Sequence, residues 1–402
     1  MDYKGLLRQI EITIREIDSS EEAASTISNV ARTVIKNFRE QLGLSGSRLY
    51  VLRDDQYELV QRVGTSSQQE VGIHVPADYA PIAAAIENGV ILMEPNDPAV
   101  DPVLEKRLGA RRFAAIAVGD NDEYIVSFNV SPEARRDDVL FSLSMIRHAI
   151  SQKLREKRFE TILAEAQRIQ HSILPQRPPV HPGYEIFGKT IPAETVSGDF
   201  YDFIQVSNST LGLAIADGTG HGLTAALVVR DVHMGLRMGV DRDFKIGRTL
   251  QKLNQIIHRS RMSTKFVSLF YGELETNGTF IYSNAGHNPP FLLLKQNRVE
   301  MLRHGGTILG PTPDATYQRG YVYLEPGDLL CLYTDGIIEA HDKQDREFGT
   351  DRLIKMVRRN RDLSAQEIAR SVLQATTDWA RGQDMDDRTI VIVKATAELK
   401  NE

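Results

Sequence analysis

Residues 215–227 read IADGTGHGLTAAL: an apolar run, an acid, three glycines within five residues, and small residues suited to a helix. A glycine-rich turn between a strand and a helix is typical of a phosphate-binding loop. A carboxylate at the head of that loop would repel a phosphate, so Asp217 raises the alternative that the turn holds a cation. Further acids in similar turns would favour the cation.

Acid-bearing turns recur beside apolar strands in the C-terminal half of the chain. A single acid–glycine turn is an ordinary loop, but several at strand ends predict a site built by loops. Clustered carboxylates either acquire raised pKa values or bind metal, and aspartates without His or Cys favour Mg²⁺ or Mn²⁺. The acids are Asp199 and Asp202 in SGDFYDF, Asp217, Asp335 after LLCLYT, and Asp386 and Asp387 before TIVIVK.

The sequence from Tyr184 onward predicts an α+β domain with antiparallel sheets. Many short strands alternate with turns, and we expect hairpin turns at NG (277–278) and PGD (326–328). Consecutive strands linked by hairpins argue against a doubly wound parallel fold. Helices are expected at 222–239, 245–260, about 350–360 and 364–381.

Six separated motifs resemble those of a known family. SGDFYD, ADGTGHG, SNAGHNPP, YTDGIIEA, EFGTDRL and MDDRTI are similar, in order and spacing, to the motifs of bacterial SpoIIE/RsbU-type PPM protein phosphatases, over residues 185–395. The resemblance implies a domain at 183–398 with an αββα sandwich, in which helices flank two antiparallel sheets. It also implies two Mn²⁺ or Mg²⁺ ions at one edge of the sandwich.

The resemblance assigns roles to the acids. Asp217 would bridge both metal ions, and the backbone carbonyl of Gly218 would ligate one of them. Asp199 would support the second ion, directly or through water, so Asp217 and Asp199 are the expected catalytic acids. Asp387 is the alternative to Asp386. The full implied ligand set is Asp199, Asp217, Gly218, Asp335 and Asp386.

The implied activity is hydrolysis of phosphoserine or phosphothreonine in a protein. A water activated by both metal ions would attack phosphorus in line, without a covalent phospho-enzyme. The implied substrate is a STAS-type anti-sigma-factor antagonist in a bacterial partner-switching pathway for stress or development. His221 and His287 are candidates for a general acid, but we favour loop structure or substrate positioning for both. Asn284 and Asn288 are expected to satisfy turn backbone groups.

Two alternatives to a phosphatase stay open. A GHKL-type ATPase or kinase would share a DxGxG pattern with DGTGHG, but it gives no reason for Asp335 or for the pair Asp386 and Asp387. A non-catalytic sensory scaffold with a decayed phosphatase domain conflicts with the intact set of acids. Arg388 stands where relatives usually have an apolar residue, and we expect it to bias phosphate binding or to lie exposed.

A long helix is predicted from Val139 to Leu174, and PQRPPVHPG (175–183) ends it. The charged insert SQKLREKR (151–158) breaks the phase between two heptad seams. This pattern predicts a coiled-coil linker over 141–178 that forms a homodimer; the alternative is a helix lying along its own domain. The seam residues are Val139, Leu143, Ile146 and Ile150, then Phe159, Ile162, Ala166, Ile169 and Ile173.

Residues 1–140 predict an α+β module that resembles a GAF domain, a small sensory module, in its order of elements. The first helix has a seam for a partner helix or for its own domain. Ser19 and Glu22 predict a capping box for the second helix, and GLSGS (43–47) would end that helix. The apolar positions are Tyr3, Leu7, Ile10, Ile14 and Ile17 in the first helix and Ile27, Val30, Val34 and Phe38 in the second.

The order of sensory module, linker and phosphatase predicts that the module controls activity through the linker. An upstream ligand or protein would act on the module, and the homodimer would form through the linker and the N-terminal helices. The helix after Asp217 and Gly218 would be the lever. A linker that only tethers and dimerises is the alternative.

Composition limits the cellular setting. The 402 residues predict more than one domain, and the net charge of −6 lacks the basic excess of nucleic-acid-binding proteins. No apolar run reaches spanning length, and the N-terminus has no apolar signal core. The single cysteine, Cys331, predicts a buried thiol in a reducing compartment. We therefore expect a cytoplasmic protein, with neither nucleic acid nor membrane among its partners.

Overall fold

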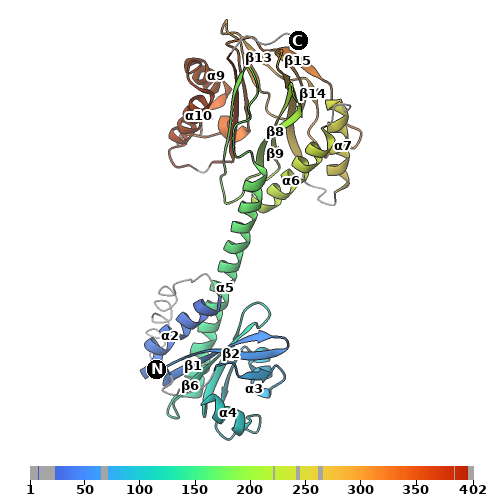
Figure 1. The fold of residues 1–402 in the computed structure, drawn as a ribbon. Coiled ribbons are helices and arrows are strands. Elements are labelled where there is room, and N and C mark those ends of the chain that lie inside the picture. The colour runs from blue at the N-terminus through green and yellow to red at the C-terminus, as the bar shows by residue number, and fades with distance from the viewer. Residues whose placement is uncertain are drawn as a thin grey trace. The chain divides into compact units, whose positions relative to one another are not determined.

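The structure is a computed structural model that describes residue 8 and residues 23–64, 71–220, 222–240, 245–260, 266–383 and 385–396. The chain forms two compact units, Met1–Thr161 and Ile162–Glu402, called here the N-terminal and C-terminal units (Figure 1). The predicted seam of the first helix, the capping box of Ser19 and Glu22, and His221 lie outside the described residues. No helix in the described ranges has the length and apolar character needed to cross a membrane.

The N-terminal unit is built on one six-stranded antiparallel sheet. Because side chains alternate along each strand, Ala114 and Ile116 face α2 and the first half of α5, whereas Phe113 and Ala115 face α3 and α4. The strand order is β3-β2-β1-β6-β5-β4. The elements are α2 (Ala23–Leu42), β1 (Leu44–Arg53), β2 (Gln56–Val63), β3 (His74–Pro76), α3 (Ala80–Asn88), β4 (Val90–Met93), α4 (Pro102–Leu108), β5 (Phe113–Val118), β6 (Tyr124–Val130) and α5 (Arg136–Ile173).

Predictions for this unit hold in part. The apolar face of the second helix is confirmed, since Ile27, Val30, Val34 and Phe38 are all buried. The prediction that GLSGS ends that helix is confirmed, because α2 stops at Leu42 and Gly43, at φ 62°, makes the bend into β1, which begins at Leu44. The elements β3, β4 and α4 were not predicted. The GAF resemblance stays a prediction.

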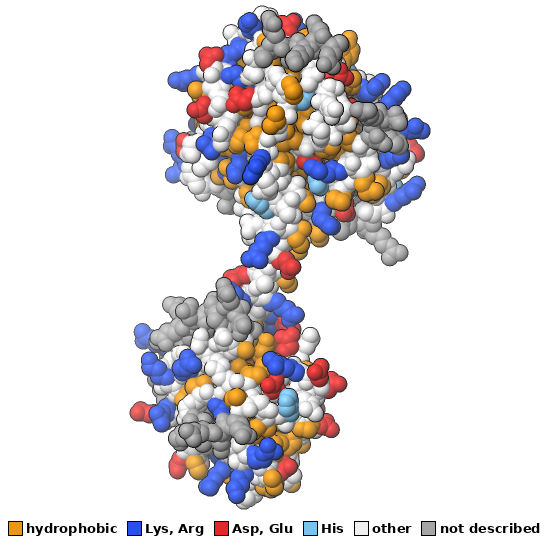
Figure 2. All heavy atoms as spheres, viewed as in Figure 1, with side chains coloured by type: hydrophobic (Ala, Val, Ile, Leu, Met, Phe, Trp, Pro, Cys, Tyr) orange, Lys and Arg blue, Asp and Glu red, His pale blue; other side chains and the backbone are white. Residues whose placement is uncertain are grey.

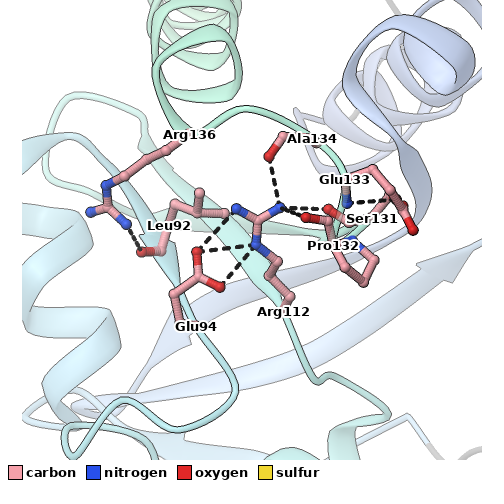
Figure 3. A network of polar contacts seen from close by, with 8 residues as sticks. All are labelled: Leu92, Glu94, Arg112, Ser131, Pro132, Glu133, Ala134 and Arg136. Atoms are coloured by element: carbon pink, nitrogen blue, oxygen red, sulfur yellow. Dashed lines mark hydrogen bonds and ion pairs between the residues drawn. The ribbon is translucent and has the colours of Figure 1, made fainter.

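Two arginines fasten the start of α5 to the edge of this sheet (Figure 3). Arg112 forms a bidentate pair with Glu94, with Nε 3.0 Å from Oε2 and Nη2 3.0 Å from Oε1. The same guanidinium donates to carbonyl oxygens within residues 131–134, just before the helix. Arg136, the first residue of α5, donates to the carbonyl of Leu92 in β4 at 3.1 Å. These contacts fix the direction in which α5 leaves the sheet.

The seams of α5 differ in their surroundings. The first seam, from Val139 to Ile150, is buried against the unit's own sheet, which was the open alternative to a coiled coil. In the second seam Phe159, Ile162 and Ile169 are exposed by 61%, 48% and 50%. The predicted single long helix is thus confirmed, and its pairing with a second copy stays a prediction.

The C-terminal unit stacks two sheets with helices outside them (Figure 1). The first sheet has the order β14-β11-β10-β9-β8, with β15 also on β11, and the second has the order β13-β12-β16-β17-β7. Helices α6 and α7 cover the outer face of the first sheet, and α9 and α10 cover that of the second. Apolar side chains of the two inner faces meet between the sheets. On the face seen in Figure 2, hydrophobic side chains gather in the middle of this unit.

The strands of this unit are β7 (Tyr184–Ile191), β8 (Asp199–Ser207), β9 (Thr210–Gly218), β10 (Val267–Glu275), β11 (Thr279–Ala285), β12 (Phe291–Leu293), β13 (Val299–Met301), β14 (Gly305–Gly306), β15 (Gly320–Tyr323), β16 (Leu329–Tyr333) and β17 (Arg388–Ala395). The helices are α6 (Gly222–Gly239), α7 (Ile246–Arg259), α8 (Asp335–Ile338), α9 (Gly349–Arg359) and α10 (Ala365–Ala380).

The predicted α+β class with antiparallel sheets is confirmed, apart from a two-residue parallel pairing of β11 with β14. All four predicted helices are present, and NG joins the β10–β11 hairpin. The prediction of a hairpin at PGD is wrong, because β15 pairs with β11 and β16 with β12 and β17, in the other sheet. A turn sequence specifies local chain reversal at Gly327, φ 96°, but not which strand becomes the partner.

Candidate metal centre

Strand alternation brings Asp199 and Asp217 together between the two sheets. Leu211, Leu213 and Ile215 of β9 point into the space between the sheets, so Asp217 shares that face. Asp199, the first residue of β8, lies directly opposite Asp217 in the antiparallel register. Side chains of directly opposite residues are neighbours, so the two carboxylates share one end of the sandwich.

The second sheet completes this end with hydroxyl groups. Thr334 Oγ1 donates to Asp199 Oδ2 at 2.7 Å and accepts from the backbone NH of Thr389 at 2.9 Å. Both threonines are fully buried. The two sheets are therefore joined by a polar contact at the acid-bearing end.

Glycine lets a third acid approach. Helix α8 begins at Asp335, and a Cβ on Gly336 would lie 2.1 Å from the carbonyl oxygen of Asp387. Only glycine allows this contact, which places Asp335 next to the turn that carries Asp386. Burial, followed by the charges of Glu339 and Asp386, raises the pKa of Asp335 to about 6.

The backbone at Gly198 lies close to the carbonyl oxygen of Gly218. A Cβ on Gly198 would lie 3.1 Å from the carbonyl oxygens of both Gly218 and Gly220. The backbone NH of Gly218 donates to the carbonyl of Gly198 at 3.0 Å. The glycine-rich turn therefore rests on the backbone that leads into Asp199.

The acids at this end repel one another. Burial, followed by the charges of Asp335, Asp386 and Asp387, raises the pKa of Asp217 to about 8. Burial and the charge of Asp217 hold the pKa of Asp199 well above its usual range, although Thr334 donates to it. The charged groups that act most strongly on both acids are carboxylates. Such a cluster calls for a cation.

The adjacent acids Asp386 and Asp387 have different surroundings. Asp387 is 5% exposed, and its two oxygens accept from the backbone NH groups of Ala193 at 2.7 Å and Gly198 at 2.5 Å. Asp386 is exposed, and its Oδ1 accepts from the NH of Asp387 at 2.7 Å. Asp387 thus holds the 193–198 backbone, whereas no hydrogen bond to the second oxygen of Asp386 is found among the described residues. This supports the choice of Asp386 as the ligand.

The donor set matches a hard divalent cation. Carboxylates with backbone carbonyl oxygen are the ligands that Mg²⁺ and Mn²⁺ prefer, and water completes their shells. Within the described part of the chain, no three side chains from His, Cys, Asp and Glu are close enough together to form a cage on their own. The residues therefore fit the predicted ions in chemistry and need the Gly218 carbonyl and water to complete the coordination.

His287 lies behind the acids. Its Nδ1 is 2.7 Å from Ser268 Oγ, and Ser268 is paired with Asp217 across β9 and β10. Asn284 Oδ1 accepts from the His287 NH at 2.7 Å, as expected for a turn asparagine. Burial lowers the pKa of His287 to about 4, so the ring is neutral near pH 7. A buried, neutral ring supports loop structure over general-acid chemistry.

Two of the predicted residues lie away from the acids. Asp202 faces α6 on the outer side of the first sheet. The expectation that Arg388 binds phosphate or lies exposed is wrong, because it is 5% exposed and donates to Thr376 and Thr377 of α10 at 3.0 and 2.8 Å. Arg388 is the first residue of β17 and points to the outer face, where α10 supplies its hydrogen-bond partners. Cys331 is fully buried, as predicted.

Three further residues of this end were not predicted: Thr334, Thr389 and Glu339. Thr334 and Glu339 lie within YTDGIIEA, beside a predicted ligand. Their proximity in sequence was the available signal. The bond from Thr334 to Asp199 depends on how the two sheets stack, which no local pattern encodes.

Comparison with known proteins identifies this domain. The family profile described as "Stage II sporulation protein E (SpoIIE)" matches residues 207–396. Residues 207–396 form a SpoIIE-family domain. The predicted family and enzyme class, a protein serine/threonine phosphatase, are confirmed for the SpoIIE domain.

The chain has relatives in bacteria. The chain is 27% identical to Phosphoserine phosphatase RsbU of Bacillus subtilis over 231 residues, which cover 57% of this chain and 68% of RsbU. It is 27% identical to Protein IcfG of Synechocystis over 317 residues, 69% of this chain and 49% of IcfG. The chain thus spans about two thirds of the first relative and half of the second.

A solved structure shares the fold of the SpoIIE domain. The SiaA-PP2C domain of Pseudomonas aeruginosa superposes with a TM-score of 0.53 and 20% identity, over 60% of this chain and 98% of that chain. This similarity supports a PP2C-like arrangement of the two sheets and their flanking helices.

Proposed function

We propose that this chain is a metal-dependent phosphatase that hydrolyses phosphoserine or phosphothreonine in a protein substrate. The observation that carries the proposal is the facing pair of carboxylates, Asp199 buried and Asp217 partly buried, with further acids around them. Asp217, Asp335 and Asp386 lie within the residues that match the SpoIIE family profile. Two Mn²⁺ or Mg²⁺ ions would be held by Asp199, Asp217, the Gly218 carbonyl, Asp335 and Asp386.

When bound, the ions supply Lewis-acid stabilisation of the phosphoryl oxygens and an activated water for in-line attack. The chain's own residues orient the ligands. Thr334 fixes one oxygen of Asp199 by its hydrogen bond, and Asp199 lies opposite Asp217 in the β8–β9 register. Asp387 ties the backbone before Asp199 to the start of β17, which sets the distance between the two sheets at the site.

The proposed substrate class rests on the resemblance of the motifs to the SpoIIE/RsbU family. RsbU is named a phosphoserine phosphatase, and the six motifs of this chain agree with that family. We therefore propose a phosphorylated STAS-type anti-sigma-factor antagonist as the substrate. The GHKL-type ATPase and the scaffold are disfavoured, since neither accounts for acids contributed by both sheets.

Control by the N-terminal unit would pass along α5. Within the C-terminal unit, Gln170 Nε2 donates to the Ser197 carbonyl at 2.5 Å, and Gln170 Oε1 accepts from the Ser197 NH at 2.9 Å. Ser197 Oγ in turn accepts from the NH of Asp199 at 3.0 Å. A shift of α5 would therefore move Ser197 and, with it, Asp199, a proposed metal ligand. The exposed residues Phe159, Ile162 and Ile169 are the proposed contacts of a homodimer.

The experiment compares the full chain with Asp217→Asn on a phosphoserine peptide, at increasing Mn²⁺. We expect the wild type to release phosphate only with Mn²⁺ and the variant to be at least about 100-fold slower. ATP is tested in parallel as the substrate of the rival ATPase. Phosphate release without divalent ions, or hydrolysis of ATP alone, would contradict the proposal.

A further inference from the structure

A fully buried carboxylate outside the metal centre joins the first sheet to α6. Asp202 is 0% exposed and lies on the outer face of β8, three residues after Asp199. Arg237 of α6 donates to it twice, from Nε to Oδ2 at 2.7 Å and from Nη2 to Oδ1 at 2.9 Å. His233 Nε2 lies 3.1 Å from Oδ2, and the NH of Phe203 donates to Oδ1 at 2.8 Å.

These contacts make Asp202 the acidic partner of a buried ion pair with Arg237. Burial alone would raise the pKa of Asp202, but the contacts with His233 and Arg237 outweigh burial and hold it below its usual range. The side chain of Arg237 is 48% exposed, whereas that of Asp202 is 0% exposed, so Arg237 lies on the solvent side of the carboxylate. A bidentate arginine pair fixes both distance and orientation, which apolar packing alone does not.

We propose that Asp202 is a positioning residue: through Arg237 and His233 it fixes α6 on β8, and so holds the Asp217–Gly218 turn in place to bind divalent metal. This inference rests on the proposed metal centre. It assigns Asp202 no contact with metal or substrate.

The packing of α6 shows how the effect would reach the turn. The helix begins at Gly222, four residues after Gly218. A Cβ on Gly218 would lie 2.9 Å from Val229 Cγ2, and one on Gly198 would lie 3.2 Å from Ala225 Cβ. The first two turns of α6 thus press directly on both strands at the metal end.

The rest of the α6 interface is apolar. Val228, Val232 and Leu236 are buried against the sheet and specify no single register along it. Asp202 supplies the directional contact, near the far end of the helix. Loss of this contact would let α6 slide or tilt, and the Gly218 carbonyl would move with it.

The test measures Mn²⁺ affinity by electron paramagnetic resonance of free Mn²⁺ in titrations of the full chain. Asp202→Asn keeps the size of the side chain and removes its charge. Asp328→Asn is the matched control: Asp328 is 2% exposed and accepts from the NH groups of Lys295 at 2.7 Å and Glu325 at 2.9 Å, in the turn that joins β15 to β16. Thermal unfolding without metal is recorded for both variants.

We expect both variants to unfold at lower temperature, but only Asp202→Asn to bind Mn²⁺ about tenfold more weakly. Its kcat at saturating Mn²⁺ on a phosphoserine peptide should return to within about twofold of the wild type, because the reacting groups are intact. Equal Mn²⁺ affinity in both variants, or a kcat that saturating Mn²⁺ does not restore, would overturn the inference.

Arg237→Lys provides a second variant, because it keeps the charge and the exposed position but loses the bidentate geometry. Its Mn²⁺ affinity should fall about threefold, between the wild type and Asp202→Asn. An unchanged affinity would count against a positioning role even if Asp202→Asn fails to fold. A wild type that binds no Mn²⁺ would overturn the metal centre and this inference together, whereas a wild type that binds Mn²⁺ beside an unaffected Asp202→Asn would overturn this inference alone.

Discussion

Asp199 and Asp202 lie three residues apart on β8, both almost completely buried, yet their pKa values move in opposite directions. Burial and the charge of Asp217 raise the pKa of Asp199, whereas Arg237 and His233 overcome burial and lower that of Asp202. Asp199 faces the space between the sheets, and Asp202 faces α6. Asp202 has its cation within the chain, whereas no cationic partner of Asp199 is found among the described residues.

The difference separates two uses of the same side chain. A buried carboxylate with a bidentate arginine is complete and acts as a structural contact. A buried carboxylate among other carboxylates costs free energy until a cation arrives, as is usual for a site built for function. If the acids of the metal centre need a cation in this sense, substitutions there should change metal binding and the pH dependence of stability.

The largest effect concerns stability against pH without metal. The pKa of Asp217 is raised to about 8 in the folded chain. Its carboxyl is therefore protonated in the folded state, and ionised when unfolded, between about pH 4 and pH 8. The folded state loses stability as pH rises through this window. From pH 5 to pH 8 the loss is about 4 kcal/mol.

Asp217→Asn removes this loss, so the variant should be more stable than the wild type at pH 8 in EDTA, and closer to it at pH 5. Chemical denaturation at the two pH values measures the difference. If the free energy of unfolding changes equally with pH in the two proteins, burial and the neighbouring acids do not raise the pKa of Asp217.

Next in size is the contrast between Asp387 and Asp386. Asp387→Asn weakens two hydrogen bonds to the 193–198 backbone and should cost about 3 kcal/mol of unfolding free energy. Asp386→Asn should change stability by less than about 0.5 kcal/mol, because the side chain is exposed. Its Mn²⁺ affinity should instead fall about 10- to 100-fold. If Asp387→Asn weakens Mn²⁺ more than Asp386→Asn does, the ligand assignment is reversed.

Thr334→Val tests the hydroxyl that orients Asp199. The substitution keeps the shape but removes the donor to Asp199 and the acceptor for the Thr389 NH, which should cost about 2 kcal/mol. Thr376→Val is a matched control, since Thr376 is equally buried and accepts from Arg388 at 3.0 Å. Only Thr334→Val should also weaken Mn²⁺ binding, which titration calorimetry measures. Similar Mn²⁺ affinities in the two variants would remove Thr334 from the site.

The smallest effect is expected at Gln170. Gln170→Ala removes both contacts with Ser197 and should change the Mn²⁺ concentration for half-maximal phosphatase activity by about two- to fivefold. Gln176→Ala serves as the control, because Gln176 donates to nearby carbonyl oxygens, those of His171 and Leu174, at the end of α5. If Gln170→Ala and the wild type have the same Mn²⁺ dependence, α5 tethers the domain without acting on the metal centre.

Much of the C-terminal unit could be predicted from local patterns. The alternation of apolar residues predicted the strands, and acids at strand ends predicted one shared site. The facing positions of Asp199 and Asp217 follow from the β8–β9 hairpin, which is a local feature. Helices α6, α7, α9 and α10 follow from their apolar periodicity.

The remaining features depend on contacts distant in sequence. The bond from Thr334 to Asp199 spans 135 residues and joins two sheets. Contacts distant in sequence also determine two further features. Arg388 is buried under α10, and the chain passes from one sheet to the other at the PGD turn. Asp202 was grouped with the acids at strand ends, although strand alternation already places it on the face of β8 opposite Asp199. Its partners His233 and Arg237 lie in a separate helix, and no local pattern identifies them.

The most direct test of the central claim is the number of Mn²⁺ ions that the chain binds, measured by calorimetry or paramagnetic titration at pH 8. The acids of the metal centre, which have no cationic partner among the described residues, should bind two ions in the wild type, and Asp217→Asn should lose at least one of them. The ion pair of Asp202 with Arg237 should bind no metal ion, so Asp202→Asn should still bind two ions, with lower affinity. A wild type that binds no Mn²⁺, or an Asp217→Asn variant that binds it as tightly as the wild type, would contradict the account.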